Sequence, residues 1–293
     1  MRTLNLLHLT HKNVDPDGFA GVVWGREIFG GSLHVDSPGI VVRRLIERFK
    51  ISTSPTVKPD VLFIYDVNLR ERVGLPEGVE LKRYVIFDHH PKYEREFFEG
   101  SIKFFHKPRS ALVLNLFDYS EKAGLHLSDD LLLIFAVALV TDTALLRTAT
   151  GEELTYLGYF LKKRRLEEVF EIIMRGRLSR DILKRAEKMR MYNVYGMKVG
   201  ILEVADDDEF HLFIDVLFEP LGLDVIVGDT NWGSWVFTRK RLLQKINKIF
   251  KDSGFEWNSW GRIEGKKWWE ILRTLENSLG GSDEKVKYNR YDH

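Results

Sequence analysis

The sequence predicts an α/β fold in which a doubly wound, mainly parallel sheet is followed by a smaller C-terminal α/β domain. Three short apolar runs end at polar clusters, as is typical of strands buried on both faces of a parallel sheet; they are residues 4–9, 61–66 and 84–87. Between the first two runs, residues 19–28 and 39–49 carry apolar side chains at helical spacing. Strands that alternate with helices in this way predict a doubly wound sheet.

The segments that follow predict further helices and then a second domain. Residues 110–121 and 128–139 each begin with a serine suited to cap a helix. Residues 162–190 form a charged helical stretch with eleven Lys or Arg against five Asp or Glu. The remaining apolar patterns predict strands at 199–204, 210–216, 224–227 and 234–238, and helices at 239–250 and 266–278.

The chain length and its charge distribution support this division. A length of 293 residues suits two domains, which we expect at 1–165 and 191–293, with a basic helical linker at 166–190. The net charge of +1 conceals segments of opposite sign, with formal charges of +4 for 1–190, −8 for 191–229 and +5 for 230–293. A basic face on the C-terminal domain would suit an anionic partner, although ordinary solvated faces explain the same counts.

The composition excludes several classes of chemistry. The chain has no Cys, which excludes disulfides, thiolate metal sites, iron–sulfur clusters and cysteine nucleophiles. Its longest apolar run, 131–140, is half the length needed to span a bilayer, so we expect a cytoplasmic protein with no membrane partner. Many Lys, Arg and Glu with a single Gln are typical of thermophile proteins.

Carboxylate and imidazole side chains follow the predicted strands at their carboxyl ends. They are His11, Asp15 and Asp17 after the first strand, Asp66 after the next, Asp88, His89 and His90 after the third, and Asp142 at the end of a later helix. The ligand crevice of an open α/β sheet lies at these strand ends. Several carboxylates cannot all remain ionised there without cations. Sulfur-free ligands suit Mn²⁺, Mg²⁺ or Co²⁺, and Zn²⁺ less specifically. Two ions about 3.5–4 Å apart form a site class that hydrolyses phosphoesters.

These motifs resemble those of the DHH phosphoesterase family. The motifs are His11-x-x-x-Asp15-x-Asp17-Gly18, then Asp66, then Asp88-His89-His90, then Asp142 in Thr-Asp-Thr, in the order and at about the spacing that the family shows. The family includes RecJ-type exonucleases, nanoRNases that also dephosphorylate pAp, cyclic-dinucleotide phosphodiesterases and family II inorganic pyrophosphatases. The resemblance covers the first 150 to 180 residues and extends only loosely to the rest.

The resemblance implies a role for each matching residue. His11, Asp15 and Asp66 would hold one metal ion, and Asp17, Asp66, His89 and Asp142 the other, with Asp66 as the bridge. His90 would face the substrate, binding the scissile phosphate or assisting proton transfer, and Asp88 would orient the histidine pair. The nucleophile would be a metal-bridging hydroxide with no covalent intermediate, and Mn²⁺ is the expected cofactor, with Mg²⁺ or Co²⁺ compatible. Homodimers are common in the family, and the sequence leaves open whether this chain forms one.

The expected substrate-binding residues are less well defined. The Gly-Gly-Gly-His loop of nuclease-like family members is absent, and residues 260–265 stand near its place, so whether Arg262 replaces the histidine stays open. Arg239 is either the counterpart of a strand-borne basic residue of that domain or a surface charge at a helix start. Arg109 is a candidate phosphate contact, next to Ser110 as an ordinary helix cap.

Tryptophan is concentrated near the C-terminus. Six of seven Trp residues lie in the last quarter of the chain: Trp232, Trp235, Trp257, Trp260, Trp268 and Trp269. Trp beside Lys and Arg is typical of platforms that stack single-stranded bases, although a Trp-rich core is an equal alternative. We therefore expect a metal-dependent phosphodiesterase acting on single-stranded DNA or RNA or on short oligonucleotides. The alternatives are a phosphatase of pAp, cyclic dinucleotides or pyrophosphate, and an inactive nucleic-acid-binding protein.

Overall fold

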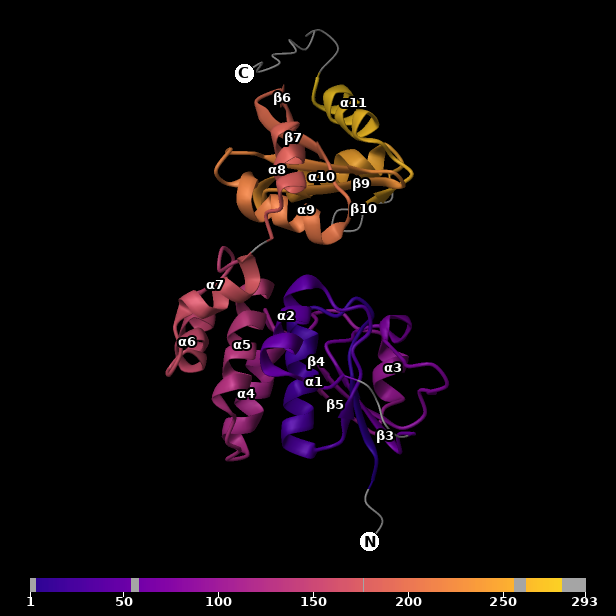
Figure 1. Ribbon diagram of the computed structural model, residues 1–293. Coiled ribbons are helices and arrows are strands. Elements are labelled where there is room, and N and C mark those ends of the chain that lie inside the picture. The colour runs from indigo at the N-terminus through magenta and orange to yellow at the C-terminus, as the bar shows by residue number, and fades with distance from the viewer. Residues whose placement is uncertain (1–3, 54–57, 176, 256–261, 281–293) are drawn as a thin grey trace. The chain divides into compact units, whose positions relative to one another are not determined.

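The computed structural model divides the chain into two compact units, residues 1–175 and 176–293 (Figure 1). It describes residues 4–53, 58–175, 177–255 and 262–280 of the 293. Within these residues, no helix combines the length and the apolar character that crossing a bilayer requires.

Unit 1 contains a five-stranded, all-parallel sheet in the order β2-β1-β3-β4-β5. Its strands are β1 (Leu6–Leu9), β2 (Ser32–Leu33), β3 (Val61–Tyr65), β4 (Tyr84–Asp88) and β5 (Lys103–His106). The three predicted strands are therefore confirmed. Two edge strands were not predicted, because β2 has only two residues and β5 begins with exposed side chains instead of a buried apolar run.

Helices cover both faces of this sheet, as the doubly wound prediction requires (Figure 1). They are α1 (Pro16–Phe29), α2 (Ile40–Phe49), α3 (Arg95–Glu99), α4 (Leu112–Lys122), α5 (Asp129–Asp142), α6 (Gly151–Phe160) and α7 (Leu166–Met174). One hydrophobic core joins α1, α4 and α5 to the sheet, and a smaller core joins the opposite face to Phe97 and Phe98 of α3. Nine of the fourteen residues of α5 are buried, which explains its nearly uniform apolar sequence.

The helix starts confirm one predicted cap and correct another. Ser128 caps α5, since its Oγ accepts a hydrogen bond from the N–H of Leu131 at 3.2 Å. The prediction that Ser110 caps the next-earlier helix is wrong, because α4 begins two residues later and Ser110 Oγ donates to Glu153 instead. The carboxylate of Asp17 accepts from the first N–H groups of α4, so a residue far away in the sequence takes the place of the local cap.

The basic segment 166–190 is shared between the two units. Helix α7 buries Val169, Ile172 and Ile173 in the main core of unit 1. Helix α8 (Arg180–Glu187) packs Ile182 and Ala186 against a core of unit 2. The structure therefore divides the expected linker at residues 175–176, because the apolar side of each helix is buried in the core of a different unit.

Unit 2 is the smaller α/β domain that the sequence predicts, with a mixed sheet in the order β10-β9-β8-β7-β6. Its strands are β6 (Arg190–Val194), β7 (Met197–Glu203), β8 (Val225–Thr230), β9 (Gly233–Thr238) and β10 (Arg262–Glu264), of which only β7 and β8 pair in parallel. Helices α10 (Leu243–Asp252) and α11 (Trp268–Leu279) cover one face, and α8 and α9 (Asp207–Phe213) the other.

The strand predicted at 210–216 is wrong, because this segment belongs to α9 and to a π-helical turn, Ile214–Phe218. Asp206 caps α9 by accepting from the N–H of Glu209 at 2.9 Å, and three acidic residues occupy the first turn. Negative side chains favour a helix N-terminus, and this signal outweighs the high strand propensity of the apolar residues that follow.

Two glycines bring α1 into close contact with the sheet. A Cβ at Gly21 would overlap the ring of Tyr65, and one at Gly25 would overlap both Tyr65 Oη and His8 Nδ1. These two atoms are 3.0 Å apart and hydrogen bonded, and both side chains are fully buried. Burial lowers the pKa of His8 to about 4, which keeps its imidazole neutral. His8 is therefore a core histidine. Because Gly21 and Gly25 let α1 pack directly on the sheet, they determine where the first turn of α1 lies relative to the ends of the strands.

We expect Gly25→Ala to lower the free energy of unfolding of unit 1 by roughly 2–3 kcal/mol, because neither Tyr65 nor His8 has room to move. Gly158→Ala on α6 is the matched control, since a Cβ there meets no atom within 4 Å. That change should stabilise the helix by roughly 0.5–1 kcal/mol. Denaturant unfolding followed by circular dichroism measures both, and equal effects of the two substitutions would contradict the close packing of α1.

Candidate metal centre

Side chains from four segments meet at the carboxyl ends of the parallel strands of unit 1. His11 follows β1, Asp15 and Asp17 lie at the start of α1, and Asp66 follows β3; His89 and His90 follow β4, and Asp142 ends α5. The side chains form three sets of three, and within each set one possible ligand atom from each residue lies within 4.8 Å of the other two. The sets are His11, Asp15 and Asp66; Asp17, His89 and Asp142; and Asp66, His89 and His90. All six metal-ligand candidates of the sequence thus belong to this cluster.

Asp66 lies at the centre of the cluster and divides it in two. Its Oδ2 is 3.5 Å from His11 Nε2, which also lies 3.4 Å from Asp15 Oδ2. Its Oδ1 is 3.1 Å from His89 Nε2, which lies 3.5 Å from Asp17 Oδ2. One carboxylate therefore presents an oxygen to each of two His–Asp pairs, which is the arrangement of a bridging ligand between two cations.

The backbone positions both histidines with the same atom directed into the cluster. His11 Nδ1 lies 2.7 Å from the carbonyl oxygen of Lys12, and His89 Nδ1 lies 2.8 Å from that of Arg109. A carbonyl oxygen only accepts hydrogen bonds, so each Nδ1 carries the proton and donates it. The lone pair of a neutral ring is then on Nε2, which is how a histidine ligand to a metal is held.

Two buried polar atoms of the cluster, His11 Nε2 and Asp66 Oδ1, make no hydrogen bond of good geometry among the described residues, although groups of opposite charge lie 3.1–3.5 Å away. Both side chains are about 95% buried, and an unsatisfied buried polar atom is costly. A divalent cation on each side of Asp66 would satisfy both atoms. The residues present therefore fit divalent metal ions, since imidazole and carboxylate groups are both common ligands of such ions.

Without bound cations, protons would balance the charge of the cluster. Burial opposes protonation of His11 and His89, but the neighbouring carboxylates outweigh it and raise their pKa values to about 11 and about 10. Burial and the Asp66 charge raise the pKa of Asp17 to about 7, while the two histidines hold the pKa of Asp66 itself below its usual range. Burial and the other carboxylates also raise the pKa of Asp142. Protons and divalent cations would therefore compete for the same groups.

Asp17 and Asp142 connect the cluster to helix ends. Asp17 is fully buried and accepts hydrogen bonds from the N–H groups of Leu112 and Val113 at 2.5 and 3.1 Å. These bonds fix the carboxylate and favour its ionised form at the positive end of α4. Asp142, in contrast, ends α5, where the helix dipole disfavours a carboxylate. A cation beside Asp142 would relieve this repulsion.

Close backbone contact and left-handed residues shape the loops of the cluster. Gly18 lies in the first turn of α1 and permits close packing: a Cβ there would overlap Thr10 Oγ1 and lie 3.2 Å from His11 Nε2. Asp66 has a φ of 57°, which costs energy for a side chain other than Gly, and the residues 144–146 after Asp142 have φ values of 50°, 56° and 68°. Such strained conformations are concentrated at functional sites.

Asp88 orients His90, which is one of the two histidines that it was expected to orient; His89 is held by the carbonyl oxygen of Arg109 instead. The Asp88 carboxylate is fully buried and accepts hydrogen bonds from the N–H of His90 at 3.0 Å and from its Nδ1 at 2.9 Å. The Nε2 of His90 is thereby left for a ligand, and 26% of this side chain is exposed. His106 Nε2 donates to the carbonyl oxygen of His90 at 2.7 Å, a contact that sequence spacing did not reveal because it joins β5 to the end of β4.

The guanidinium of Arg109 is directed into an ion-pair network instead of the cluster. It lies 3.0 Å from Asp118 and 3.2 Å from Glu152, and donates to Tyr156 Oη at 3.2 Å. Its backbone carbonyl, however, accepts from His89. Arg109 therefore supports the site through the main chain of its loop, while its side chain ties that loop to α4 and α6.

The other expected substrate residues lie in unit 2. Arg239 pairs with Glu219 at 3.0 Å, and Arg262 lies in β10, with its side chain outside the described part of the structure. Trp232 and Trp269 are 41% and 52% exposed, and Trp235 stacks on Phe210. Trp257 and Trp260 fall outside the described residues, and the guanidinium of Arg190 covers Trp268.

Comparisons with known proteins were made at the level of sequence and of structure. No family model and no curated protein matches the chain. A structure of a Methanococcus jannaschii protein assigned to the family II inorganic pyrophosphatases has 18% identity and a TM-score of 0.50, over 94% of this chain and 100% of that one. RecJ from Thermus thermophilus in complex with Mn²⁺ has 11% identity and a TM-score of 0.45, over 96% of this chain and 53% of its own, so this chain spans about half of that RecJ. A manganese-bound exonuclease RecJ has 11% identity and a TM-score of 0.40, over 93% of this chain and 89% of its own.

The similarity to the M. jannaschii structure establishes the fold of this chain. This fold is a five-stranded parallel sheet between helices, followed by a second, mixed sheet that also has five strands. The α/β fold class that the sequence predicts is confirmed.

We expect metal binding to release protons, because His11 and His89 must lose theirs before Nε2 can bind a cation. The affinity for Mn²⁺ should therefore rise as the pH rises from about 6 towards about 9. Titration calorimetry of EDTA-stripped protein near neutral pH, in two buffers of different ionisation enthalpy, should show a release of at least one proton. Binding heats that are identical in the two buffers would contradict the protonated, metal-free cluster.

Proposed function

We propose that this protein is a metal-dependent phosphoesterase that uses two divalent cations, with Mn²⁺ as the preferred ion. The observation that carries the proposal is the division of the Asp66 carboxylate between two His–Asp pairs. His11, Asp15 and Asp66 would hold one ion, and Asp17, Asp66, His89 and Asp142 the other. When bound, such a pair of cations supplies an activated water molecule and neutralises the charge of a phosphate.

The residues of the chain supply orientation and proton transfer. Asp88 fixes the His90 ring through Nδ1, so that Nε2 faces outward at the partly exposed edge of the cluster. From there it can donate a hydrogen bond to a phosphate oxygen, or a proton to a leaving oxygen. The backbone carbonyls of Lys12 and Arg109 keep the rings of His11 and His89 from rotating.

Single-stranded nucleic acids or short oligonucleotides are the proposed substrates. The support comes from unit 2, where Trp232 and Trp269 expose a large part of their rings and basic residues outnumber acidic ones after residue 230. Exposed Trp rings stack bases without regard to sequence. An inactive nucleic-acid-binding protein is the weaker alternative, since every expected ligand position is filled.

Hydrolysis of a small phosphate compound is the second candidate function. The fold similarity to a protein assigned to the family II inorganic pyrophosphatases extends over that whole chain and favours pyrophosphate as a test compound. Hydrolysis of pAp or of a cyclic dinucleotide would use the same cluster. Pyrophosphate needs a compact cage of cations and has no base to stack, so the exposed Trp rings separate the two functions.

We expect Asp66→Asn to abolish Mn²⁺-dependent hydrolysis, by at least about 10³-fold, and to remove binding of at least one metal ion. Asn tolerates the left-handed backbone at this position, so the fold should remain intact. Asp130→Asn, on the exposed start of α5, is the control. Metal counting by mass spectrometry and hydrolysis of a substrate panel give the result, and full activity of the Asp66 variant would refute the bridging role.

We expect Trp232→Ala and Trp269→Ala to slow cleavage of a labelled single strand about tenfold each and to leave pyrophosphate hydrolysis unchanged, because each stacked base contributes roughly 1–3 kcal/mol. Tyr159→Ala serves as the control, because this ring in unit 1 is 56% exposed. If oligonucleotide cleavage is unaffected by both Trp substitutions, these rings do not stack the substrate.

A further inference from the structure

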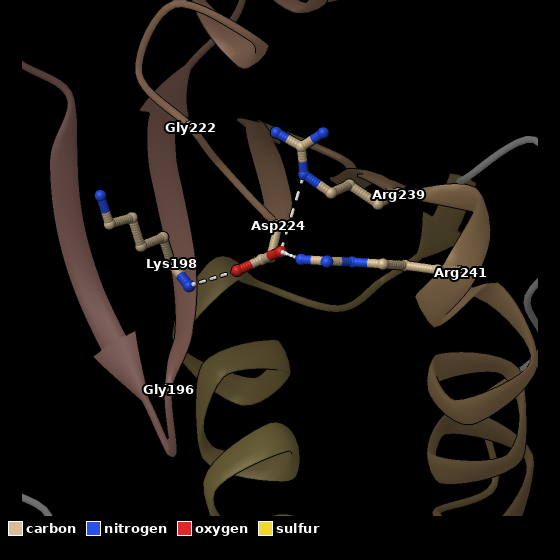
Figure 2. A pocket seen from close by; sticks show the side chains of 6 residues that line it. All are labelled: Gly196, Lys198, Gly222, Asp224, Arg239 and Arg241. Carbon is tan, nitrogen blue, oxygen red and sulfur yellow. Dashed lines mark hydrogen bonds and ion pairs between the residues drawn. The ribbon is translucent and has the colours of Figure 1, made fainter.

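Unit 2 contains a pocket of about 450 Å³, and three of its six lining residues are cationic (Figure 2). It lies at the end of the sheet where the β6–β7 turn, the start of β8 and the end of β9 meet. Its lining residues are Gly196, Lys198, Gly222, Asp224, Arg239 and Arg241. The three cations and one carboxylate of the lining sum to +2, and Glu219, which pairs with Arg239 at 3.0 Å without lining the pocket, lowers the local formal charge to +1. The pocket therefore carries the charge opposite to that of a phosphate monoester, which is anionic near neutral pH.

Asp224 organises the cations of the pocket. One of its oxygens lies 2.8 Å from Arg241 Nη2 and 3.6 Å from Arg239 Nε, and the other accepts from the backbone N–H of Lys198 at 3.1 Å. Figure 2 shows the two arginines converging on this carboxylate. Burial alone would raise the pKa of Asp224, but the hydrogen bond from Arg241 and that from the Lys198 backbone outweigh burial and lower this pKa. The arginines are thus held in place before any ligand arrives.

Within the described part of the chain, several N–H groups of Arg241 and Lys198 are free to donate hydrogen bonds to a ligand in the pocket. The side chain of Arg241 is 72% exposed and contacts Asp224 through a single Nη. The ammonium group of Lys198 has no ion-pair partner among the described residues, and lies close enough to Gly222 that a Cβ there would be 3.9 Å away. Two glycines at the rim let a ligand approach the backbone. If the cluster served only as a stabilising surface ion pair between Asp224 and the two arginines, the third cation, Lys198, would have no role.

An aromatic pair lies beside the cations. The guanidinium of Arg239 lies over the ring of Phe218 at 5.2 Å, and Phe218 packs edge-on against Phe237 at 4.9 Å. Phe237 is 38% exposed and precedes Arg239 by two residues at the end of β9. Inorganic phosphate has no group that could stack on the Phe237 ring, whereas a base attached to a phosphate could stack on it.

We propose that this pocket binds the terminal phosphate of a nucleotide or short oligonucleotide, with Lys198 and Arg241 as the phosphate contacts and Phe237 as the base contact. The choice of a nucleotide as the ligand rests on the proposed function. The inference that the pocket binds a phosphate group does not. Arg239 and Asp224 position the contacting groups.

The test measures binding of a fluorescent trinucleotide by the full chain in EDTA, so that the metal centre contributes no cations and no hydrolysis. The wild-type protein should bind the 5′-phosphorylated probe about tenfold more tightly than the 5′-hydroxyl probe, and Lys198→Ala and Arg241→Ala should each reduce this preference severalfold. Lys240→Ala is the matched control, because it removes the same charge from the same basic run without lining the pocket.

Equal binding of the two probes by the wild-type protein would overturn the proposal, as would an equal loss in all three lysine and arginine variants. Phe237→Ala should weaken binding of the phosphorylated trinucleotide and leave pyrophosphate binding unchanged. Pyrophosphate that competes as well as the trinucleotide would exclude a nucleotide as the ligand. A phosphate preference in EDTA together with undiminished hydrolysis by the Asp66→Asn protein would refute the proposed function and leave the pocket standing.

Discussion

The two oxygens of Asp66 face opposite sides of a buried cluster, and the arrangement of unit 1 around the strand ends depends on this carboxylate. A buried anion between two imidazoles requires compensation by protons or by cations. Because β3 is the central strand of the sheet, the loops after β1 and β4 lie on either side of Asp66. The strand order therefore delivers one histidine to each oxygen, and a positive φ at Asp66 turns its side chain between them.

The remaining groups depend on how helices pack below the strand ends. Glycines in α1 bring this helix against Tyr65 and so set the height of Asp15 and Asp17. Asp17 in turn satisfies the first amides of α4, which couples the start of one helix to the start of another. Helix α5 runs through the core and brings Asp142 to the same place with the unfavourable end of its dipole. A substitution in this core would therefore act on the candidate ligands without touching them.

The two units carry different chemistry. Unit 1 concentrates carboxylates and imidazoles in a largely buried cluster, where divalent cations fit. Unit 2 places Lys and Arg around Asp224 and exposes aromatic rings on its surface, groups that suit phosphates and bases. In the proposed function, unit 1 carries out the hydrolysis and unit 2 recognises the substrate. The absence of Cys, which first excluded sulfur chemistry, agrees with a site built from His and Asp alone.

The sequence by itself determined the alternation of strands and helices, the class of fold and the residues of the candidate metal site. These features follow from apolar periodicity and from motifs at strand ends, both of which are local. Only the tertiary structure decided that Asp17 takes the place of Ser110 as a cap, that Arg109 acts through its carbonyl oxygen, and that segment 166–190 belongs to two units. It also decided which cations gather around Asp224. Each of these outcomes depends on groups that are distant in the sequence, and no local pattern records how such groups pack.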